Sequence, residues 1–493
     1  MTISFVIDYI DIYFMKNNYG LRILIVFLVI NGYTPCMSQD KISSVNEVTD
    51  AYIDKQMDNL VKAIHVPVFK NKVYNVLDFG AVAGGKHDNT AFFAKAIDKC
   101  SLEGGGMVVI PKGQYLTGAI HLKSNVNLHL EEGCELLFIT NPDAYLPIVH
   151  TSYEGNEIMN YSPLVYAYKQ KNVALTGKGV LNGQADKNNW WPWSGSKHYG
   201  HTEGTPSQND AHNRDRLINM VKNNVPLKDR VFGKGYQYRT LFFQTVMCEN
   251  VLVSGVTFIN APFWIMHPFK SKHVTIDGVT VRSHGVNNDG CDPEYCSFVR
   301  IANCLFDTGD DCIAIKSGRN EDGRRVNIPS ENIMVEDCVM KDGHGGVVIG
   351  SEISAGVRNV YVRNCKMDSP NLDRAIRIKS NTARGGFVHN VYVKNIEIGQ
   401  VKECVLRINT SYGVYNEPEG TFMPDIKNIV LTNVKVKNGG KYALFVDGRK
   451  ELPVKDVVFR NVTIDKVEEP YKIDNLESLK FSNTYINGKL YQD

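Results

Sequence analysis

Acidic and basic residues recur in four short segments of the second half of the chain. The segments read NNDGCDP, TGDDCIAIKSG, GHGGVVIGSE and AIRIKSN, and the last three share an isoleucine, one variable residue and a serine. Counting back seven residues from each serine reaches Asp310, His344 and Asp373 in turn. In stacked neighbouring strands, Asp310 and His344 would share one face about 4.8 Å apart. Asp289, in the preceding segment, falls on the same side.

This grouping of ionisable side chains favours a catalytic site. Close carboxylates cost free energy and raise at least one pKa, so a structural protein has little reason to gather Asp289, Asp310 and Asp311. An isolated Asp-Asp pair is more simply a solvated turn, but recurrence at aligned places outweighs that interpretation. A proton-donating acid facing a carboxylate that activates water is what glycoside hydrolysis by inversion requires, with about 6.5 to 9.5 Å between the groups.

Two cations follow on the fourth segment. Arg377 and Lys379 alternate with Ile378, so they point to the same face of their strand. A guanidinium and an ammonium placed there suit the carboxylate of an acidic sugar. Solvated outward residues of a strand are an equally good interpretation of this pair taken alone.

The elements that must position these residues form a repeat. A nine-residue pattern with apolar residues at positions two, four, seven and nine, and Asn, Asp or Gly at six, predicts strand, bend and strand. Successive units recur at intervals that fit one coil of a solenoid with loops of varying length. The units begin at Asn250, His273, Phe298, Asn332, Asn359, Asn390, Asn428 and Asp456.

Coils that stack as parallel strands pair every backbone group except at the two ends. We therefore predict an all-β fold, a single-stranded right-handed parallel β-helix with a short N-terminal capping helix. Cys304, Cys338 and Cys365 fall at position seven and predict a stack of buried free thiols. Cys291 and Cys296 are the best candidates for a local disulfide, with two unpaired thiols an equal alternative.

The part of the chain that contains the nine-residue repeat defines its domain organisation. Residues 71–493 are the expected β-helix domain, and the helix near its start begins at Asp88, Asn89 or Thr90 and ends at glycines. Residues 37–70 are expected to be a leader or linker, and a large loop insertion is expected around 153–239.

The N-terminus predicts export. The apolar run LRILIVFLVI, Leu21–Ile30, has the length of a signal-peptide core rather than a membrane span, so residues 1–36 are the expected signal and Met15 a more ordinary start than Met1. The predicted location is the periplasm, the cell envelope or the medium. Cys36 is a weak candidate for lipid attachment.

Composition excludes several classes. With 55 Lys+Arg against 53 Asp+Glu and 43% hydrophobic residues, the chain is neither disordered nor a multi-pass membrane protein. A net charge of +2 gives no support to nucleic-acid binding. We expect a monomer without a membrane span after signal removal.

The coil pattern together with NNDGCD, GDDCIAIKSG, GHGG and RIK resembles glycoside hydrolase family 28, the polygalacturonases and their pectin-degrading relatives. The segment NVLDFGAVAGGKHDNTAFFAKAID is similar to the capping region of the same superfamily. The resemblance runs from about Val73 to the C-terminus. It implies a right-handed parallel β-helix, single-displacement inversion, no cofactor or metal, and a pectic polysaccharide or oligogalacturonide as substrate.

The resemblance also implies roles. Asp310 would be the general acid, Asp289 and Asp311 would position and deprotonate water, and His344 would support the acid. Arg377 and Lys379 would hold the galacturonate carboxylate. Two departures from the family pattern, Asn287-Asn288-Asp289 and the additional Gly346, remove no ionisable group, so they bear on substrate preference.

Further candidates lie in the loops. Trp191 in NWWPWSG is expected either to stack on a sugar or to belong to the insertion's own core, with equal weight. The remaining candidates for substrate binding are Trp264, Arg319, Arg324 and His267, and for His267 the favoured interpretation is that it orients a loop. The long insertions resemble those of bacterial and plant-like members that attack chain ends, which favours exo action.

Three alternatives stay open. A rhamnogalacturonan or xylogalacturonan hydrolase ranks lower, because neutral rhamnose would leave Arg377 and Lys379 without a partner. A pectate-type lyase shares the fold but needs a Lys or Arg base and commonly calcium. A non-catalytic β-helix adhesin or carbohydrate-binding protein would have no activity to lose on mutation of Asp310.

Overall fold

The computed structural model describes residues 48–413 and 419–493. The predicted signal segment, Met15 and Cys36 lie outside the described residues. Residues 49–493 form one unit, and within the described ranges no helix is long and apolar enough to cross a membrane.

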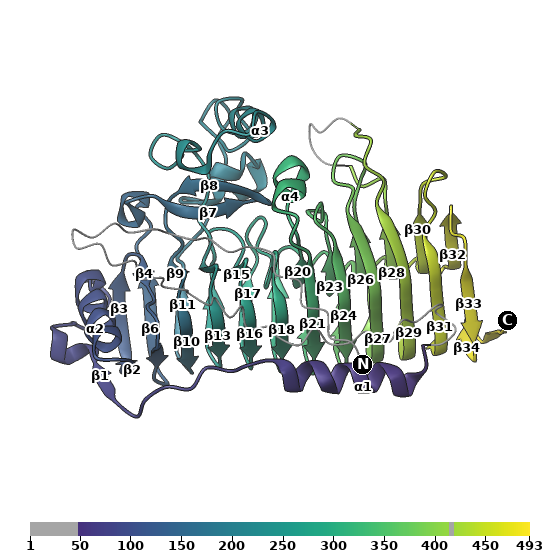
Figure 1. Cartoon of the computed structure of the whole chain (residues 1–493), viewed down its shortest axis with the longest axis horizontal. Coiled ribbons are helices and arrows are strands. Elements are labelled where there is room, and N and C mark those ends of the chain that lie inside the picture. Colours follow the sequence, from purple (N-terminus) through teal and green to yellow (C-terminus); the bar gives the residue numbers. More distant parts are fainter. Residues whose placement is uncertain (1–47, 414–418) are drawn as a thin grey trace, which may run out of the picture. The chain divides into compact units, whose positions relative to one another are not determined.

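The unit is a parallel β-helix, as the repeat predicts (Figure 1). One arm of each coil belongs to a 23-stranded sheet. The strands of this arm are β1 (Val73–Asn75), β2 (Gly106–Ile110), β5 (Val126–Leu130), β10 (Lys171–Gly177), β13 (Glu249–Ser254), β16 (Lys272–Asp277), β18 (Ser297–Ala302), β21 (Ser330–Glu336), β24 (Val357–Arg363), β27 (Phe387–Gln400), β29 (Asp425–Asn438), β31 (Lys455–Ile464) and β33 (Leu479–Ser482).

The second arm follows the bend in each coil and belongs to the same sheet. Its strands are β3 (Gly113–Thr117), β6 (Cys134–Phe138), β11 (Val180–Asn182), β14 (Thr257–Ile259), β17 (Thr280–Ser283), β19 (Leu305–Thr308), β22 (Val339–Met340), β25 (Lys366–Asp368) and β34 (Thr484–Ile486). A last strand, β35 (Lys489–Tyr491), pairs antiparallel with β34 and ends the stack.

The third side of the coils forms two separate sheets. The four-stranded sheet contains β4 (Ile120–His121), β9 (Val165–Tyr168), β12 (Phe243–Val246) and β15 (Met266–Phe269). The six-stranded sheet contains β20 (Ile313–Ile315), β23 (Val347–Ile349), β26 (Arg374–Lys379), β28 (Cys404–Asn409), β30 (Tyr442–Asp447) and β32 (Glu469–Asp474).

The nonapeptide bends because its polar residues adopt the left-handed conformation. Asn395 and Asn433, at position six, both have positive φ, and asparagine is one of the few residue types that tolerates this region. Each side-chain amide donates to the equivalent asparagine of the previous coil, with Asn433 Nδ2 3.2 Å from Asn395 Oδ1. Position one is also left-handed, at Asn390 and Asn428 for example, so the repeat contains two bends rather than one.

The cysteines are packing residues. Cys304, Cys338 and Cys365 are buried in the central core, which confirms the predicted thiol stack. All ten cysteines of the described chain are free, so the alternative of two unpaired thiols holds for Cys291 and Cys296.

Helix α2 (Thr90–Leu102) caps the first coil, as predicted. Asn89 precedes it, and Phe93 and Ile97 bury their side chains against the first strands. The cap covers the edge of the sheet and the core at the start of the stack.

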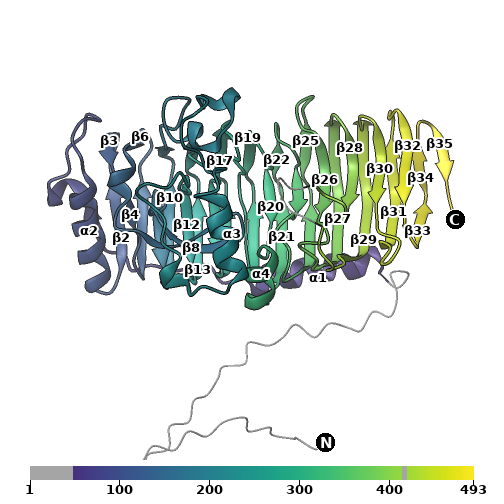
Figure 2. The same cartoon turned by 90° about the horizontal axis from the view of Figure 1, so that it is seen from above.

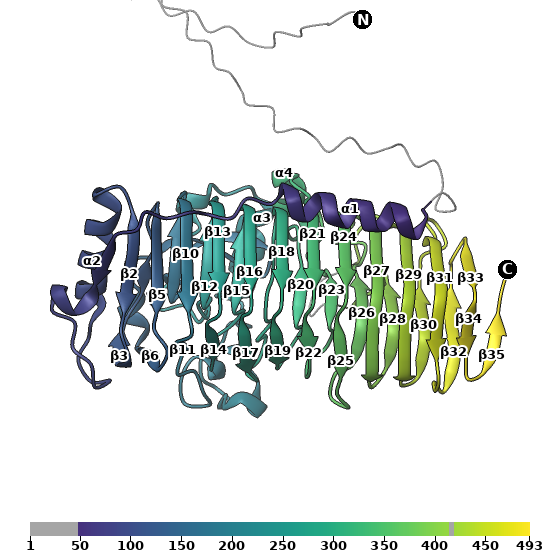
Figure 3. The same ribbon diagram turned by 90° about the horizontal axis from the view of Figure 1, so that it is seen from below.

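A second helix corrects the prediction of a linker over residues 37–70. Helix α1 (Asp50–Ala63) buries Ile53, Met57 and Leu60, a helical spacing hidden among polar residues. It crosses the first arm of the coils from β18 towards β31 (Figure 3). Lys394 donates to Asp54 at 2.7 Å, and Arg363 and Arg460 contact Asp58 and Asp50.

The insertion predicted around 153–239 is also corrected, because residues 165–182 form a regular coil with strands β9, β10 and β11. The excursion is therefore two segments: an antiparallel hairpin of β7 (Val149–Tyr153) and β8 (Asn156–Asn160), and residues 183–242. The second segment contains η4 (Trp191–Ser194), η5 (Lys197–Tyr199), α3 (Arg214–Lys222) and η6 (Leu227–Asp229), and α3 packs on α4 (Asn320–Val326) (Figure 2).

Candidate active site

The NNDGCDP segment lies where the third side of the coils is interrupted. Isolated bridges join Met266 to Cys291 and Cys291 to Ile313, so this segment spans the gap between the four-stranded and six-stranded sheets. The backbone amide of Gly290 donates to the carbonyl of Asp311 at 2.9 Å. This alignment carries Asp289 to the position beside the next coil's Asp310-Asp311 pair.

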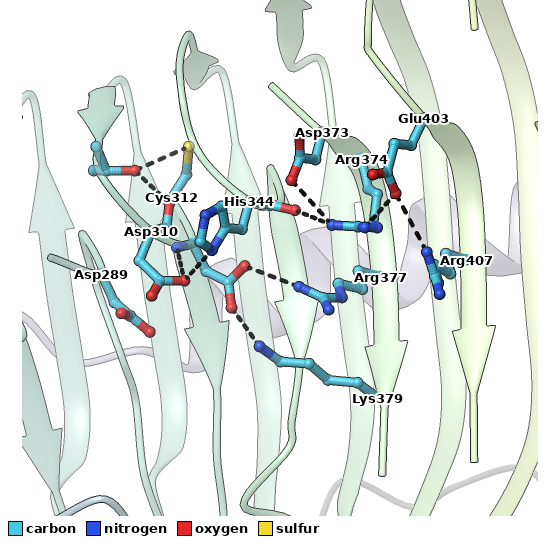
Figure 4. Close-up of polar contacts among 12 residues, drawn as sticks. Asp289, Asp310, Cys312, His344, Asp373, Arg374, Arg377, Lys379, Glu403 and Arg407 are labelled. Atoms are coloured by element: carbon cyan, nitrogen blue, oxygen red, sulfur yellow. Dashed lines mark hydrogen bonds and ion pairs between the residues drawn. The ribbon is translucent and has the colours of Figure 1, made fainter. Parts of the chain in front are cut away.

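The structure brings the three predicted carboxylates together, and Figure 4 shows Asp289 beside Asp310. One oxygen from each of Asp289, Asp310 and Asp311 lies within 4.8 Å of the other two. These distances between nearest oxygens are shorter than the about 6.5 to 9.5 Å between carboxyl groups that is usual in inverting enzymes. The spacing alone therefore does not select inversion.

His344 lies one coil on, as the serine count predicts. Its Nδ1 is 2.9 Å from Asp310 Oδ1. Gly343 makes this approach possible: its φ is positive, in a region that L side chains rarely adopt, and a Cβ there would lie 2.6 Å from the Asp310 carbonyl oxygen. The loop that carries His344 thus lies directly against the backbone of the coil that carries Asp310.

The protons in this cluster are unevenly distributed. Burial raises the pKa of Asp310, but the hydrogen bond with His344 outweighs it and lowers the pKa to about 2. The same bond raises the pKa of His344 to about 9. Burial and the Asp310 carboxylate raise the pKa of Asp289 well above its ordinary value. At neutral pH the free site therefore holds a proton on His344, and its surroundings oppose ionisation of Asp289.

Arg377 and Lys379 lie on β26 and face the same carboxylate. Lys379 Nζ donates to Asp311 Oδ2 at 2.7 Å, and Arg377 Nη1 is 3.7 Å from Asp311 Oδ1. Both side chains are nearly buried, so the interpretation as freely solvated strand residues is wrong. They place positive charge next to the Asp311 carboxylate.

Sequence reasoning missed a buried lysine at the centre of the site. Lys316 Nζ lies 3.4 Å from both Asp289 Oδ2 and Glu352 Oε2, and 4.3 Å from the centre of the Trp264 ring. Burial favours the neutral amine, but the carboxyls of Asp292, Asp289 and Glu352 raise the pKa of Lys316 well above its ordinary value. The alternation of the strand in GDDCIAIKSG could have indicated it, because Lys316 is two residues after Ala314 and therefore lies on the same strand face.

Asp292 was missed as well. Its side chain is fully buried, and neither carboxyl oxygen has a hydrogen-bond partner. Burial and the nearby Asp289 raise the pKa of Asp292 well above its ordinary value. Asp289 therefore sits between the Lys316 ammonium and a second buried carboxyl.

Two candidate substrate contacts are buried. His267 is completely buried, with Nδ1 3.0 Å from Gln244 Nε2 and Nε2 2.9 Å from Glu294 Oε2, which agrees with the interpretation of His267 as an orienting residue. Trp264 is 3% exposed and packs under Lys316, so it has no free face for a sugar.

The two loop arginines are also engaged within the protein. Arg319 is 5% exposed and pairs with Glu154 of the β7–β8 hairpin at 3.0 Å. Arg324 donates to the Ala383 carbonyl at 2.9 Å and stacks on Phe422. Arg319 is therefore covered, whereas Arg324 keeps 23% of its side chain exposed, so its contact with substrate stays a prediction.

The excursion approaches the site through Trp191, Tyr199 and Arg239. Trp191 is half-buried, donates to the Ala261 carbonyl at 2.9 Å and packs on Gly285, while Trp190 is the tryptophan in the buried core. The Tyr199 ring packs edge-on against Trp191, with ring centroids 5.9 Å apart, and burial and the Asp310 carboxylate raise the pKa of Tyr199. Buried Arg239 donates to Asn287 Oδ1 at 2.8 Å and fixes the segment that precedes Asp289.

Asn288, one of the two departures from the family pattern, has a structural role. Its Oδ1 accepts from Ser283 Oγ at 2.6 Å and from the Gly285 amide at 2.8 Å, and its Nδ2 donates to three backbone carbonyls. It therefore shapes the turn that presents Asp289 and does not face substrate.

The carboxylate trio has the donor set of a divalent cation site, and so does the cluster of His284, Asp307 and Asp342. In the trio, however, Lys316 and Lys379 already supply positive charge to Asp289 and Asp311. The described residues thus provide the charge that a metal would bring.

Comparison with known families agrees with this site. The model of glycosyl hydrolases family 28 matches residues 230–483, which include every residue of the trio, His344 and the two cations. The chain belongs to glycosyl hydrolase family 28. Residues 73–131 also match a model described as rhamnogalacturonase A/epimerase, pectate lyase-like, over the capping region.

Individual members of family 28 cover most of the chain. It is 27% identical over 445 residues to an exo-poly-alpha-D-galacturonosidase of Dickeya chrysanthemi, covering 84% of this chain and 71% of that protein. A crystal structure of a hyperthermoactive exopolygalacturonase from Thermotoga maritima is 42% identical, with a TM-score of 0.85 and coverage of 89% and 97%. An exopolygalacturonase structure from Yersinia enterocolitica is 25% identical, with a TM-score of 0.66 and coverage of 84% and 76%.

Proposed function

We propose that this family 28 hydrolase cleaves α-1,4-galacturonosidic bonds of pectin from a chain end by a single displacement with inversion. The observation that carries the proposal is the trio of Asp289, Asp310 and Asp311 flanked by Arg377 and Lys379. The acids suit the hydrolysis of a glycosidic bond, and the two cations suit a uronate carboxylate.

In the proposed mechanism, Asp310 and His344 act as one acid. His344 carries the shared proton in the free site and passes it along the 2.9 Å hydrogen bond to Asp310, which delivers it to the glycosidic oxygen as that bond breaks. Water held by Asp289 and Asp311 attacks the anomeric carbon from the opposite face. The proton of that water passes to one of the two carboxylates, so the charges balance.

Lys316 would hold Asp289 ready for this step. A base has to lose its own proton before it accepts one, and burial opposes that loss at Asp289. The ammonium at 3.4 Å lowers the free energy of the ionised form. We propose that Lys316 is a positioning residue for the base.

The assignment to chain-end attack rests on the excursion. Trp191, Tyr199 and Arg239 bring its residues against the coil of Asp289 and Asp310, and Glu154 of the hairpin contacts Arg319 just after the catalytic coil. A wall on one side of the site stops a polymer from continuing past it. The named exo-acting relatives support this proposal.

Product analysis tests the proposal. Purified protein incubated with polygalacturonate should release monomer alone, and the released sugar should have inverted anomeric configuration by NMR. A ladder of oligomers would defeat the exo assignment, and retained configuration would defeat single displacement. Preferential cleavage of rhamnogalacturonan would favour that alternative substrate.

Two controls separate the other classes. A lyase would lose activity in EDTA and release unsaturated products that absorb ultraviolet light, whereas the proposed hydrolysis survives EDTA without such products. A non-catalytic binding protein would show no turnover, and Asp310→Asn would then change nothing.

We also propose that the protein is exported and acts as a monomer. The apolar run at Leu21–Ile30 supports export. Cell fractionation and size-exclusion chromatography with light scattering test the two statements separately.

A further inference from the structure

A row of outward-facing residues leads away from the site along the six-stranded sheet. Arg377 of β26 is in register with Arg407 of β28, Arg407 with Phe445 of β30, and Phe445 with Lys472 of β32. Residues in register on parallel strands share a face and follow one another at about 4.8 Å. Figure 4 shows the first step, from Arg377 to Arg407.

Phe445 holds the two outer cations of this row. The guanidinium carbon of Arg407 lies 4.6 Å from the centre of the Phe445 ring, and Lys472 Nζ lies 5.6 Å from the same centre. Because Phe445 is on the strand between them, the ring separates the cations and attracts both. Lys472 is exposed, and Arg407 keeps 24% of its side chain exposed, so both can reach a ligand.

The strip carries an excess of positive charge. Burial and the charges of Arg374 and Arg377 lower the pKa of Arg407, and Glu403 is shared between Arg374 and Arg407. Gathering guanidinium groups in this way is unfavourable unless an anion offsets the repulsion. The row therefore suits a ligand with repeated negative charges.

The neighbouring row limits where such a ligand can lie. Lys379 is in register with Asn409, which is followed by Asp447 and Asp474. A polyanion leaving the site is thus repelled on one side and attracted on the other. Arg407 and Lys472, two strands apart, are about 9.6 Å from each other along the stack, so they can bind two different carboxylates of one extended chain.

We propose that Arg407, Phe445 and Lys472 form a track that binds carboxylates of an acidic polysaccharide beyond the sugars at the cleavage site. The track lies on the opposite side of the carboxylate trio from the excursion. This inference rests on the proposed function, and it specifies that function by making a long polymer a better ligand than a disaccharide.

Binding by an inactive chain tests the track separately from hydrolysis. On the Asp289→Asn background, we expect Arg407→Ala and Lys472→Ala each to raise the dissociation constant for polygalacturonate five- to tenfold and that for digalacturonate less than twofold. Lys435→Ala, on β29 of the large sheet, is the matched control and should change neither constant. Binding of fully methyl-esterified pectin should not depend on Arg407 or Lys472.

The outcomes are distinct. Equal weakening of polymer and disaccharide binding would mean that Arg407 acts only through Arg377, and it would overturn the track, as would unchanged polymer binding in both variants. Lys472→Ala keeps the test decisive if Arg407→Ala disturbs the fold, because Lys472 is exposed and remote from the trio. Absence of hydrolysis by the wild-type protein would defeat the proposed function, while the binding comparison would still decide the track.

Discussion

The two arms of the 23-stranded sheet and the six-stranded sheet show opposite ways of treating polar groups. On the 23-stranded sheet, asparagines such as Asn395 and Asn433 form side-chain hydrogen bonds with one another in ladders that repeat from coil to coil. Beside the six-stranded sheet, buried acids such as Asp289 and Asp292 have carboxyl oxygens without hydrogen-bond partners. One surface stabilises the solenoid, and the other keeps ionisable groups in a state that costs stability.

This difference indicates what each region was selected to do. A buried polar group without a partner costs about 1–3 kcal/mol, so a site with several such groups persists only where it has a function. The ladders offset that cost by fixing the backbone on which the site stands. Mutations on the two regions should therefore separate activity from stability.

The largest effect is expected for Asp289→Asn. Loss of the base should lower kcat by about 10²- to 10⁴-fold, the usual contribution of a proton-transfer residue. Because the amide replaces a buried carboxyl that burial already disfavours, the melting temperature should stay equal or rise. Steady-state kinetics and calorimetry check this, and a lower melting temperature would contradict the contrast between the two regions.

Lys316→Met should have the next largest effect. Removing the ammonium raises the pKa of Asp289 further, so kcat should fall by about 10²-fold and the acid limb of the pH profile should move to higher pH.

Lys316→Arg should restore part of the activity and move the acid limb back, which a merely structural role for Lys316 would not produce. Lys394→Met is the matched control, since Lys394 is a nearly buried lysine paired with Asp54 of α1. An acid limb at the same pH in Lys316→Met and wild type would remove Lys316 from the mechanism.

His344→Gln tests the acid pair through pH. The pKa of His344 is raised to about 9, so its contribution to stability is complete below about 6.5 and is lost as the pH rises through 9. The pKa of Asp310 is lowered to about 2, so its contribution is complete above about 3.9 and is lost as the pH falls towards 2. In the wild type, the alkaline limb of the activity–pH profile should lie near pH 9. In His344→Gln, this alkaline loss of activity should begin at a lower pH.

Asn433→Ala should affect stability alone. It removes a ladder hydrogen bond and places alanine in the left-handed conformation, which together cost about 2–3 kcal/mol. Asn433→Gly should lose less stability, because glycine adopts the left-handed conformation without strain. Denaturant unfolding measures both, and any change of kcat beyond twofold would show that the ladder couples to the site.

Asp54→Ala should have the smallest effect. The Asp54 side chain is half exposed, so its pair with Lys394 is worth at most about 1 kcal/mol. Thermal unfolding should show a small shift with no change in activity. A large loss of stability would mean that α1 clamps the coils much more strongly than its exposed ion pairs indicate.

Sequence reasoning predicted the coils and the trio because both depend on local rules. The nonapeptide alternation fixes which residues point inward, and a constant offset from the shared serine fixes the pairing of Asp310 with His344. Predictions failed where a residue's environment comes from distant loops: Arg319 and Trp264 look available in sequence but are covered or engaged in the fold. Lys316 was missed because its partners arrive from two other coils.

The free cysteines described above bear on how the protein can be made. None of the ten in the described chain is bridged, and each is buried within the stack. Folding of residues 49–493 therefore has no oxidative step. The yield of active enzyme should be the same from a reducing cytosol as from an oxidising compartment, and treatment with dithiothreitol should leave it fully active.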